Sequence, residues 1–275
     1  MGKNWLSNKS IIVTGASSGI GADMVRLLLE YNCRVLGVSR NETKAKEFSK
    51  KLSSDNYSYY CFDVGDKGAW EHFIEHLKSI DFIPDVIINN AGIMPPFKRA
   101  CDTSIDVYEK VVKINYLSAV YSYSNILPLI EKSSTPTIVN VSSSSALATL
   151  IGTSPYTASK SALRGYTECI QRERKDIYVA LVCPGFTKTE IFREQKQTTN
   201  EGIIGKISMP ADKMAKKIIK KLRRHKKRII LGFDAHLMSG FYRIFPKFST
   251  RVFAWIFKKT KLPLFDEVFP RDNER

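Results

Sequence analysis

The chain has 275 residues, which suits one α/β domain or two small ones at most, and its 43% hydrophobic and 25% charged residues are ordinary for a globular protein. Its five cysteines are scattered without a C-x-x-C pair and its four histidines are dispersed, which argues against a disulfide framework and against a metal site. The formal net charge of +16 leaves anionic cofactors, membrane surfaces and nucleic acids open as partners, because charge alone does not choose among them.

The sequence contains no segment that predicts membrane insertion or secretion. No apolar run reaches the roughly 18–20 residues that span a bilayer. Residues 1–10 lack the apolar stretch of a signal peptide. We therefore expect a cytoplasmic location.

Short β-branched runs alternate with longer helix-like stretches along the first two thirds of the chain. In chain order, the runs that we predict as buried parallel strands are Ile11–Thr14, Val35–Val38, the weaker Tyr57–Phe62, Val86–Asn89, Thr137–Val141, Tyr178–Cys183 and a last one at Arg228–Leu231. The stretches that we predict as helices are Gly19–Tyr31, Lys67–Ile80, Ser104–Ile130, Tyr156–Lys175 and one that opens at Pro210. This alternation predicts an α/β fold, a doubly wound (Rossmann) parallel sheet of about seven strands with helices on both faces.

A glycine-rich turn, Thr14-Gly15-Ala16-Ser17-Ser18-Gly19-Ile20-Gly21, lies between the first predicted strand and the first predicted helix. Its spacing is G-x-x-x-G-x-G rather than G-x-G-x-x-G. Glycines at this point allow a tight turn and let backbone N–H groups approach a pyrophosphate at the N-terminus of a helix. The candidate phosphate-binding residues are Gly15, Ser17, Ser18, Gly19, Ile20 and Gly21.

The second predicted strand ends with Val38-Ser39-Arg40. A protein that binds NAD carries an acidic side chain near this point, where it accepts hydrogen bonds from the ribose hydroxyls. Here Ser39 leaves space and the guanidinium of Arg40 matches a phosphate. Glu42 is acidic and nearby, but it lies beyond Arg40, already in the turn. The pattern therefore favours NADP.

Three further motifs follow predicted strands in order: Asn89-Asn90-Ala91-Gly92, Tyr156-Thr157-Ala158-Ser159-Lys160 and Pro184-Gly185-Phe186-Thr187-Lys188-Thr189. Together with the glycine-rich turn they resemble the ordered signature of the short-chain dehydrogenase/reductase family, over about residues 8–232. The resemblance implies an NADP(H)-dependent oxidoreductase that interconverts a ketone or aldehyde and an alcohol.

The chemistry of such a reaction fits the residue types without the family. A tyrosine with a pKa of about 10 is a poor base at neutral pH. Lys160 lies on the same helix face as Tyr156, and its positive charge would favour the phenolate and bring the pKa of Tyr156 closer to neutral. Ser143, just past a predicted strand, can hydrogen-bond the substrate oxygen as it gains charge. Ser142 and Ser144 remain alternatives for that serine.

The resemblance assigns these roles to Ser143, Tyr156 and Lys160, and it also places Lys160 at the nicotinamide ribose. Asn115 matches the family's helix asparagine that holds a proton-relay water. Further contacts with the cofactor are implied for Asp63 and Val64 beside the adenine, Asn90 at a ribose, and Thr187 and Thr189 at the nicotinamide carboxamide. A helix-capping or solvated role stays open for Asp63, and a purely structural role stays open for Asn90.

Basic and aromatic residues dominate the last part of the chain. Residues 213–228 contain ten Lys/Arg around an apolar stripe, which is typical of a solvated helix face and is also able to attract anionic lipid. Residues 237–260 mix aromatic and basic side chains, a pattern that suits an interfacial helix, a lid over a substrate cleft or a dimer contact. We predict a catalytic domain at residues 1–232 and an appended segment at 233–275.

The expected substrate is a small apolar carbonyl compound or alcohol, bound by a homo-oligomer. The residues that fall where the family builds its cleft are Met94, Pro95, Phe97, Leu147, Leu150, Phe186 and Phe192. The alternative is a dinucleotide-fold protein that serves as a membrane-surface or nucleic-acid-binding module. Nucleic acid is the weaker alternative, since the sequence holds no recognition module beyond its charge.

Overall fold

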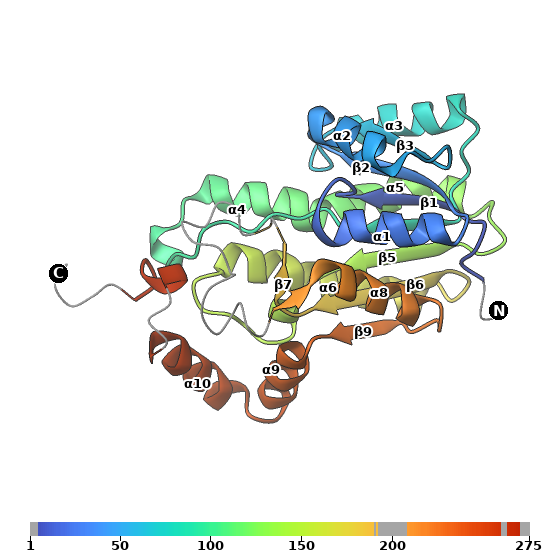
Figure 1. Cartoon of the computed structure of the whole chain (residues 1–275). Helices are drawn as coiled ribbons and strands as arrows, with labels where there is room; N and C mark the ends of the chain where they lie inside the picture. The colour runs from blue at the N-terminus through green and yellow to red at the C-terminus, as the bar shows by residue number, and fades with distance from the viewer. Residues whose placement is uncertain (1–4, 190, 192–207, 260–262, 270–275) are drawn as a thin grey trace.

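The computed structural model describes residues 5–189, 191, 208–259 and 263–269. A parallel sheet of seven strands runs through its centre, in the order β3-β2-β1-β4-β5-β6-β9 (Figure 1). The strands are β1 (Ser10–Thr14), β2 (Arg34–Ser39), β3 (Tyr57–Cys61), β4 (Val86–Asn89), β5 (Thr137–Val141), β6 (Tyr178–Pro184) and β9 (Arg228–Leu231). The strand order reverses between β1 and β4, which is where open sheets of this kind hold their ligands. The predicted doubly wound sheet is confirmed.

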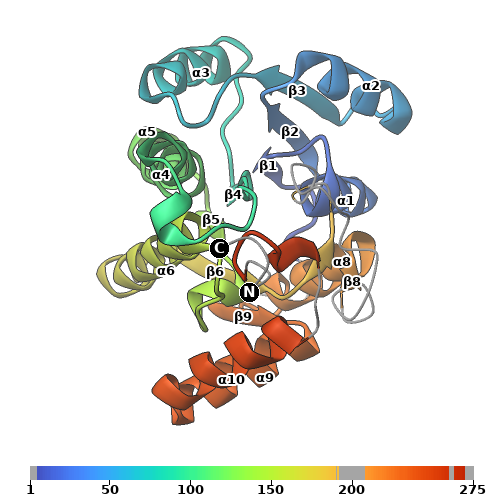
Figure 2. The same ribbon diagram turned by 90° about the vertical axis from the view of Figure 1, so that its left-hand side faces the viewer.

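Helices cover both faces of the sheet because its central strands carry apolar side chains on both faces (Figure 2). One face packs against α1 (Gly19–Glu30), α2 (Glu42–Leu52) and α8 (Ala211–Leu222). The other packs against α3 (Lys67–Ser79), α5 (Ser118–Ile130) and α6 (Ser154–Glu173). Two separate hydrophobic cores result, one on each side, and the sheet between them forms a rigid base for the loops at its edge.

Two helical segments differ from the expectation. The periodicity did not predict α2, since only Ala45 and Phe48 of its residues are buried, and Glu42 begins this helix instead of lying in a turn. The side chain of Asn41 caps α2 by accepting a hydrogen bond from the N–H of Lys44, at 2.9 Å. The stretch 104–130, expected as one helix, consists of α4 (Ile105–Val112), a π-turn (Lys113–Leu117) and α5.

The last described part of the chain is helical and lies outside the layered core. A short two-stranded ladder, β7 (Thr187–Lys188) with β8 (Met209–Pro210), precedes α8. After β9, α9 (Phe233–Ile244) and α10 (Pro246–Lys259) pack against each other at the margin of the molecule, as both ribbon views show, and a 3-10 turn follows at Pro263–Phe265. Within the described residues, none of the helices combines the length and the hydropathy that crossing a bilayer requires.

Candidate active site

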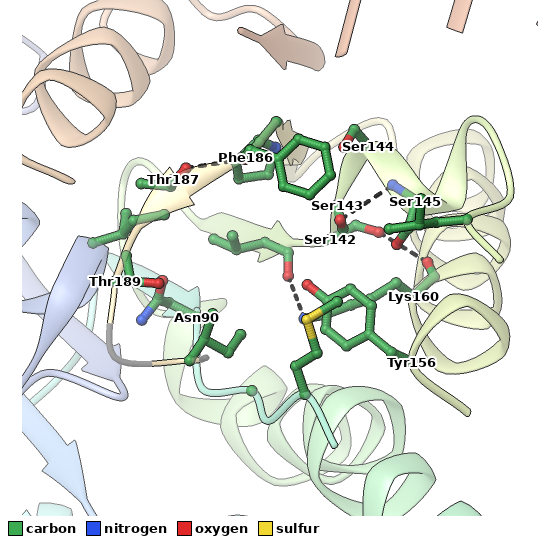
Figure 3. A pocket seen from close by; sticks show the side chains of 18 of the residues that line it. Asn90, Ser142, Ser143, Ser144, Ser145, Tyr156, Lys160, Phe186, Thr187 and Thr189 are labelled. Carbon is green, nitrogen blue, oxygen red and sulfur yellow. Dashed lines mark hydrogen bonds between the residues drawn. The ribbon is translucent and has the colours of Figure 1, made fainter. Parts of the chain in front are cut away.

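The loops after β1, β4, β5 and β6 meet at the carboxyl edge of the sheet and enclose a pocket (Figure 3). Because the strands are parallel, a motif that follows any of them is carried to this edge. Ser143, Tyr156 and Lys160 lie on one side of the pocket, and Asn90, Thr187 and Thr189 lie across from them.

Tyr156 and Lys160 project from the first two turns of α6. Pro155 stands in the first turn, where a residue without an N–H forfeits no helical hydrogen bond. The ammonium of Lys160 donates a hydrogen bond to the carbonyl of Val141, with an Nζ–O distance of 2.9 Å, and Nζ lies 6.0 Å from the ring centroid of Tyr156. The i,i+4 spacing thus brings both side chains to one buried wall of the pocket.

Burial favours the neutral form of both groups. It lowers the pKa of Lys160 to about 8. It raises the pKa of Tyr156, and a hydrogen bond with the hydroxyl of Ser143 opposes that rise. Burial is the largest cause of this rise, so the expectation that Lys160 brings the pKa of Tyr156 closer to neutral stays a prediction.

The three neighbouring serines have different surroundings. The hydroxyl of Ser142 donates to the carbonyl of Lys160 at 2.8 Å, so it ties the end of β5 to α6. Ser143 accepts from the N–H of Ser145 at 3.2 Å, and its side chain lowers the pKa of Tyr156. Ser144 is buried and also lines the pocket. Among the three, Ser143 is the serine whose side chain influences the pKa of Tyr156, which favours it as the catalytic serine.

Asn115 sits in the π-turn between α4 and α5, an irregularity that is frequent at functional sites. Its side-chain oxygen accepts from the N–H of Ile93 at 2.8 Å, and its amide nitrogen donates to the carbonyl of Ile93 at 2.9 Å and to the hydroxyl of Ser159 at 3.1 Å. These bonds join the loop after β4 to α6. Asn115 thereby holds two walls of the site, and a proton-relay role stays a prediction.

The glycine-rich turn is packed so closely that side chains are excluded. Gly15 and Gly19 have φ angles of +67° and +53°, a region that favours glycine. A Cβ on Gly21 would collide with the carbonyl oxygen of Gly15. Asn90 holds the turn from the other side, with its amide nitrogen 3.0 Å from the carbonyl oxygen of Thr14. The structural role that was left open for Asn90 is thus present, while its side chain also lines the pocket.

A second, more polar pocket extends from this turn to the end of β2. Its wall includes Gly15, Ser18, Gly19, Ile20 and, at the far end, Arg40 and Lys44. Ser17 lies in the turn but does not line it. Lys44 was missed by the sequence reasoning, because it belongs to the helix that the periodicity did not predict. The wall of this pocket thus carries two cationic side chains, Arg40 and Lys44, where the sequence predicted Arg40 alone.

Asp63 and Val64 lie beside Arg40 but not on the wall of this pocket. A carboxylate oxygen of Asp63 is 3.9 Å from a guanidinium nitrogen of Arg40, and the other accepts from the N–H of Gly65 at 2.9 Å. Val64 is buried, and its carbonyl accepts from the indole N–H of Trp70 at 3.0 Å. Both residues shape the end of β3, and contact with an adenine stays a prediction.

The loop after β6 is held by a residue that the sequence reasoning did not single out. The carboxylate of Asp234, at the start of α9, accepts from the N–H of Phe186 at 2.7 Å. Burial raises its pKa, and hydrogen bonds from backbone N–H groups oppose the rise. Thr187 donates to the carbonyl of Gly185 at 3.0 Å, while Thr189 lies against Gly19. Asp234 therefore ties α9 to the loop that carries both threonines.

The other end of the first pocket is apolar. It is lined by Ile20, Met94, Leu150, Phe186, Ile191 and Met238. Of the expected cleft residues, Phe97 packs behind this wall with Phe265, and Pro95 does not line it. The expectation for Leu147 is wrong, because it packs against Leu181 and Cys183 in a separate cluster. Phe192 lies outside the described residues. Met238 of α9 was not expected.

Comparisons with known proteins show the family to which the chain belongs. A family model described as short chain dehydrogenase matches residues 9–200. The chain is 31% identical over 200 residues to dehydrogenase/reductase SDR family member 7B of Rattus norvegicus, which covers 69% of this chain and 61% of the rat protein. It is 30% identical over 199 residues to benzil reductase ((S)-benzoin forming) IRC24 of Saccharomyces cerevisiae, which covers 69% of this chain and 76% of the yeast protein.

The fold also matches a solved structure, an alcohol dehydrogenase from the archaeon Thermococcus sibiricus complexed with 5-hydroxy-NADP. The TM-score is 0.71 at 20% identity, over 81% of this chain and 96% of that one, which establishes likeness of fold. The chain belongs to the short-chain dehydrogenase family. Its match spans 61% of the rat relative's length and 44% of that of probable oxidoreductase EphD from Mycobacterium tuberculosis.

Proposed function

We propose that the protein is an NADP(H)-dependent oxidoreductase that interconverts an apolar ketone or aldehyde and the corresponding alcohol. The observation that carries the proposal is the convergence of Ser143, Tyr156 and Lys160 on one wall of the pocket, where the side chain of Ser143 lowers the pKa of Tyr156 against the effect of burial. A phenol and a neighbouring hydroxyl beside an apolar cavity are suited to exchange a proton with an uncharged substrate oxygen.

The residues present fit a dinucleotide. The two pockets share the wall residues Ile20, Asn90, Gly92, Met94, Thr189 and Ile191, so an extended molecule can reach from Arg40 to Tyr156. The glycine-rich turn carries no side chain at Gly15 and Gly19, which line the polar pocket, so its backbone can approach a pyrophosphate there. Arg40 and Lys44 offer two cations to a ribose phosphate, and the buried hydroxyl of Ser39 lacks a hydrogen-bond partner among the described residues. These features support NADP(H).

Each catalytic residue then has a defined task. The bound nicotinamide supplies or accepts the hydride. Tyr156 donates its phenolic proton to the substrate oxygen in reduction and takes it back in oxidation. Ser143 donates a hydrogen bond to the same oxygen as it gains charge. Lys160 keeps its proton at neutral pH, since its pKa of about 8 still lies above 7, and this cation stands near the ring when the phenol gives up its proton.

The apolar lining supports the substrate class. Met94, Leu150, Phe186 and Met238 offer no charged group to a substrate at the catalytic end of the pocket. A carbonyl compound would bury its apolar body against them and leave its oxygen to Ser143 and Tyr156. A charged substrate would lose its hydration there without a counterion, which is costly.

The test is a panel of apolar ketones, aldehydes and alcohols, followed by the absorbance of NADPH and, in parallel, of NADH. We expect kcat/KM to be roughly tenfold or more higher with NADPH, because a charge-assisted hydrogen bond contributes about 1.5–3 kcal/mol. A folded protein that binds NADPH but turns over no member of the panel would refute the reaction. A preference for NADH would refute the cofactor assignment alone.

A further inference from the structure

The α9–α10 pair carries an unusual concentration of exposed apolar side chains. Nine large hydrophobic residues are exposed in the part of the chain that the structure describes, and seven belong to this pair or the residue joining its helices. They are Phe233, Leu237, Ile244, Phe245, Phe248, Trp255 and Ile256. A contiguous exposed apolar patch marks a surface that binds a partner.

The spacing of these residues gives each helix an apolar side. Phe233, Leu237 and Ile244 recur at i, i+4 and i+11, which places them on one side of α9. Phe248 and Trp255 recur at i and i+7, which places them on one side of α10. The two helices contact each other where the half-buried ring of Phe241 meets that of Phe248, at a centroid distance of 6.0 Å.

The opposite side of the pair is already occupied. Met238 of α9 lines the catalytic pocket, and Phe257 of α10 stacks on Phe265 at a centroid distance of 4.8 Å. Phe265 belongs to the cluster that packs around Tyr156. The inner face is therefore part of the wall of the active site, and the exposed residues are not core residues left uncovered by chance.

The exposed side is also strongly basic. It carries Arg243, Lys247, Arg251, Lys258 and Lys259, all exposed. The only acidic residue between positions 233 and 259 is Asp234, which is buried. The ammonium of Lys259 lies 4.2 Å from the ring centroid of Trp255, so cation and aromatic ring share one place on the surface. We call these basic residues together with the seven apolar ones the basic–aromatic face.

We propose that the basic–aromatic face docks the protein on an anionic lipid bilayer. Apolar rings that enter the boundary between headgroups and acyl chains, flanked by cations that attract acidic headgroups, are what such a surface binds. A second copy of the chain fits less well, because two such faces would bring five cations against five. Docking leaves the helices lying on the surface and inserts none across it.

Trp255 gives a direct reading of this docking. The chain has three tryptophans, and Trp255 is 57% exposed while Trp5 and Trp70 are 8% and 0% exposed. The emission of the full-length protein should shift to shorter wavelength on addition of phosphatidylcholine vesicles that contain phosphatidylserine. Vesicles of phosphatidylcholine alone should produce no shift. Trp255→Phe should abolish the shift while the protein still sediments with the acidic vesicles.

Matched variants test whether lipid binding depends on the basic–aromatic face or only on the overall charge and hydropathy of the protein. Lys258→Ala with Lys259→Ala should weaken binding to acidic vesicles roughly thirtyfold, at about 1 kcal/mol per cation. The control pair Lys50→Ala with Lys51→Ala removes two adjacent cations from the last turn of α2 and should have little effect. Phe248→Asp should likewise weaken sedimentation, whereas Ile105→Asp, at a site that is 70% exposed on α4, should leave it unchanged.

The proposal is overturned if the protein neither sediments nor shifts its emission with acidic vesicles. It is equally overturned if the control pairs behave like the variants of the face, since charge alone would then explain binding. If the emission wavelength of Trp255 shifts with protein concentration in the absence of lipid, the face binds a second copy of the chain instead. None of these measurements requires turnover, so they are independent of the proposed reaction.

Discussion

The glycine-rich turn and the α9–α10 pair differ in how tightly their residues are enclosed. At Gly21 the backbone of Gly15 leaves no room for even a methyl group, whereas nothing lies within 4 Å of a Cβ built on Gly240 in α9. Close packing restricts which residue a position accepts, so the turn carries a recognisable motif. On the exposed face of the pair, only a binding partner outside the chain restricts which residue a position accepts. The sequence of this segment was therefore compatible with an interfacial helix, a lid or a dimer contact.

The largest expected effect tests whether the enclosed region is catalytic. Tyr156→Phe removes the hydroxyl that transfers the proton, and turnover should fall by about 10²–10⁴. Affinity for NADPH should stay close to normal, because the ring remains in place. Steady-state kinetics and NADPH titration measure the two quantities. Tyr178→Phe is the control, since its hydroxyl bonds the carbonyl of Lys226, away from the pocket. Equal loss in both variants would refute the role of Tyr156.

A direct comparison of the two regions comes from adding the same methyl group to each. Gly21→Ala should destabilise the fold by about 1–3 kcal/mol, since the new Cβ meets backbone and the amide of Asn90. It should also weaken NADPH binding. Gly240→Ala should raise the free energy of unfolding by up to about 1 kcal/mol, because it adds helix propensity in open space. Urea unfolding measures both. Similar changes in the two variants would contradict the difference in packing described above.

The same contrast explains what could be predicted from the sequence. The strands were predictable because β4 and β5 are buried along their whole length and consist mostly of β-branched apolar residues. The helix α2 was not, because it buries only Ala45 and Phe48, and with it Lys44 was missed. Asp234 was missed for a different reason: its partner, the N–H of Phe186, lies 48 residues away in the chain, and no local pattern encodes that distance.

The pKa of Tyr156 could not be predicted from spacing either. The i,i+4 relation to Lys160 follows from helix geometry and is present in the structure. The direction of the shift depends on burial, which local sequence does not give, and burial is the largest cause of the pKa shift at both residues. The motif was thus sufficient to predict the relative positions of Tyr156 and Lys160, whereas the direction of their pKa shifts depends on the folded pocket.

A smaller effect is expected at the polar end of the cofactor pocket. Arg40→Asp should shift the ratio of kcat/KM values from NADPH toward NADH by about tenfold to a hundredfold, since it removes a charge-assisted contact. Lys46→Asp is the matched control, because Lys46 is exposed on α2 and does not line the pocket. An unchanged ratio in Arg40→Asp would move the discrimination to Lys44, the second cation on that wall.

The last expected effect concerns Lys160 and appears in stability. In the folded protein Lys160 releases its proton near pH 8, whereas an unperturbed lysine holds it until 10.5. Between these values the unfolded chain binds more protons, so the stability contributed by burying Lys160 rises as the pH is raised through this window. Lys160→Met has no proton to release and should lack this rise, although it loses stability at every pH because the carbonyl of Val141 is left unpaired. The difference in the free energy of unfolding between wild type and variant should therefore grow between pH 7.5 and 9.5, by at most about 1.4 kcal/mol per pH unit.

Urea unfolding at several pH values measures this difference. A difference that stays constant with pH would show that Lys160 has an ordinary pKa, and the buried wall of the pocket would then be more open to water than the packing around Tyr156 indicates.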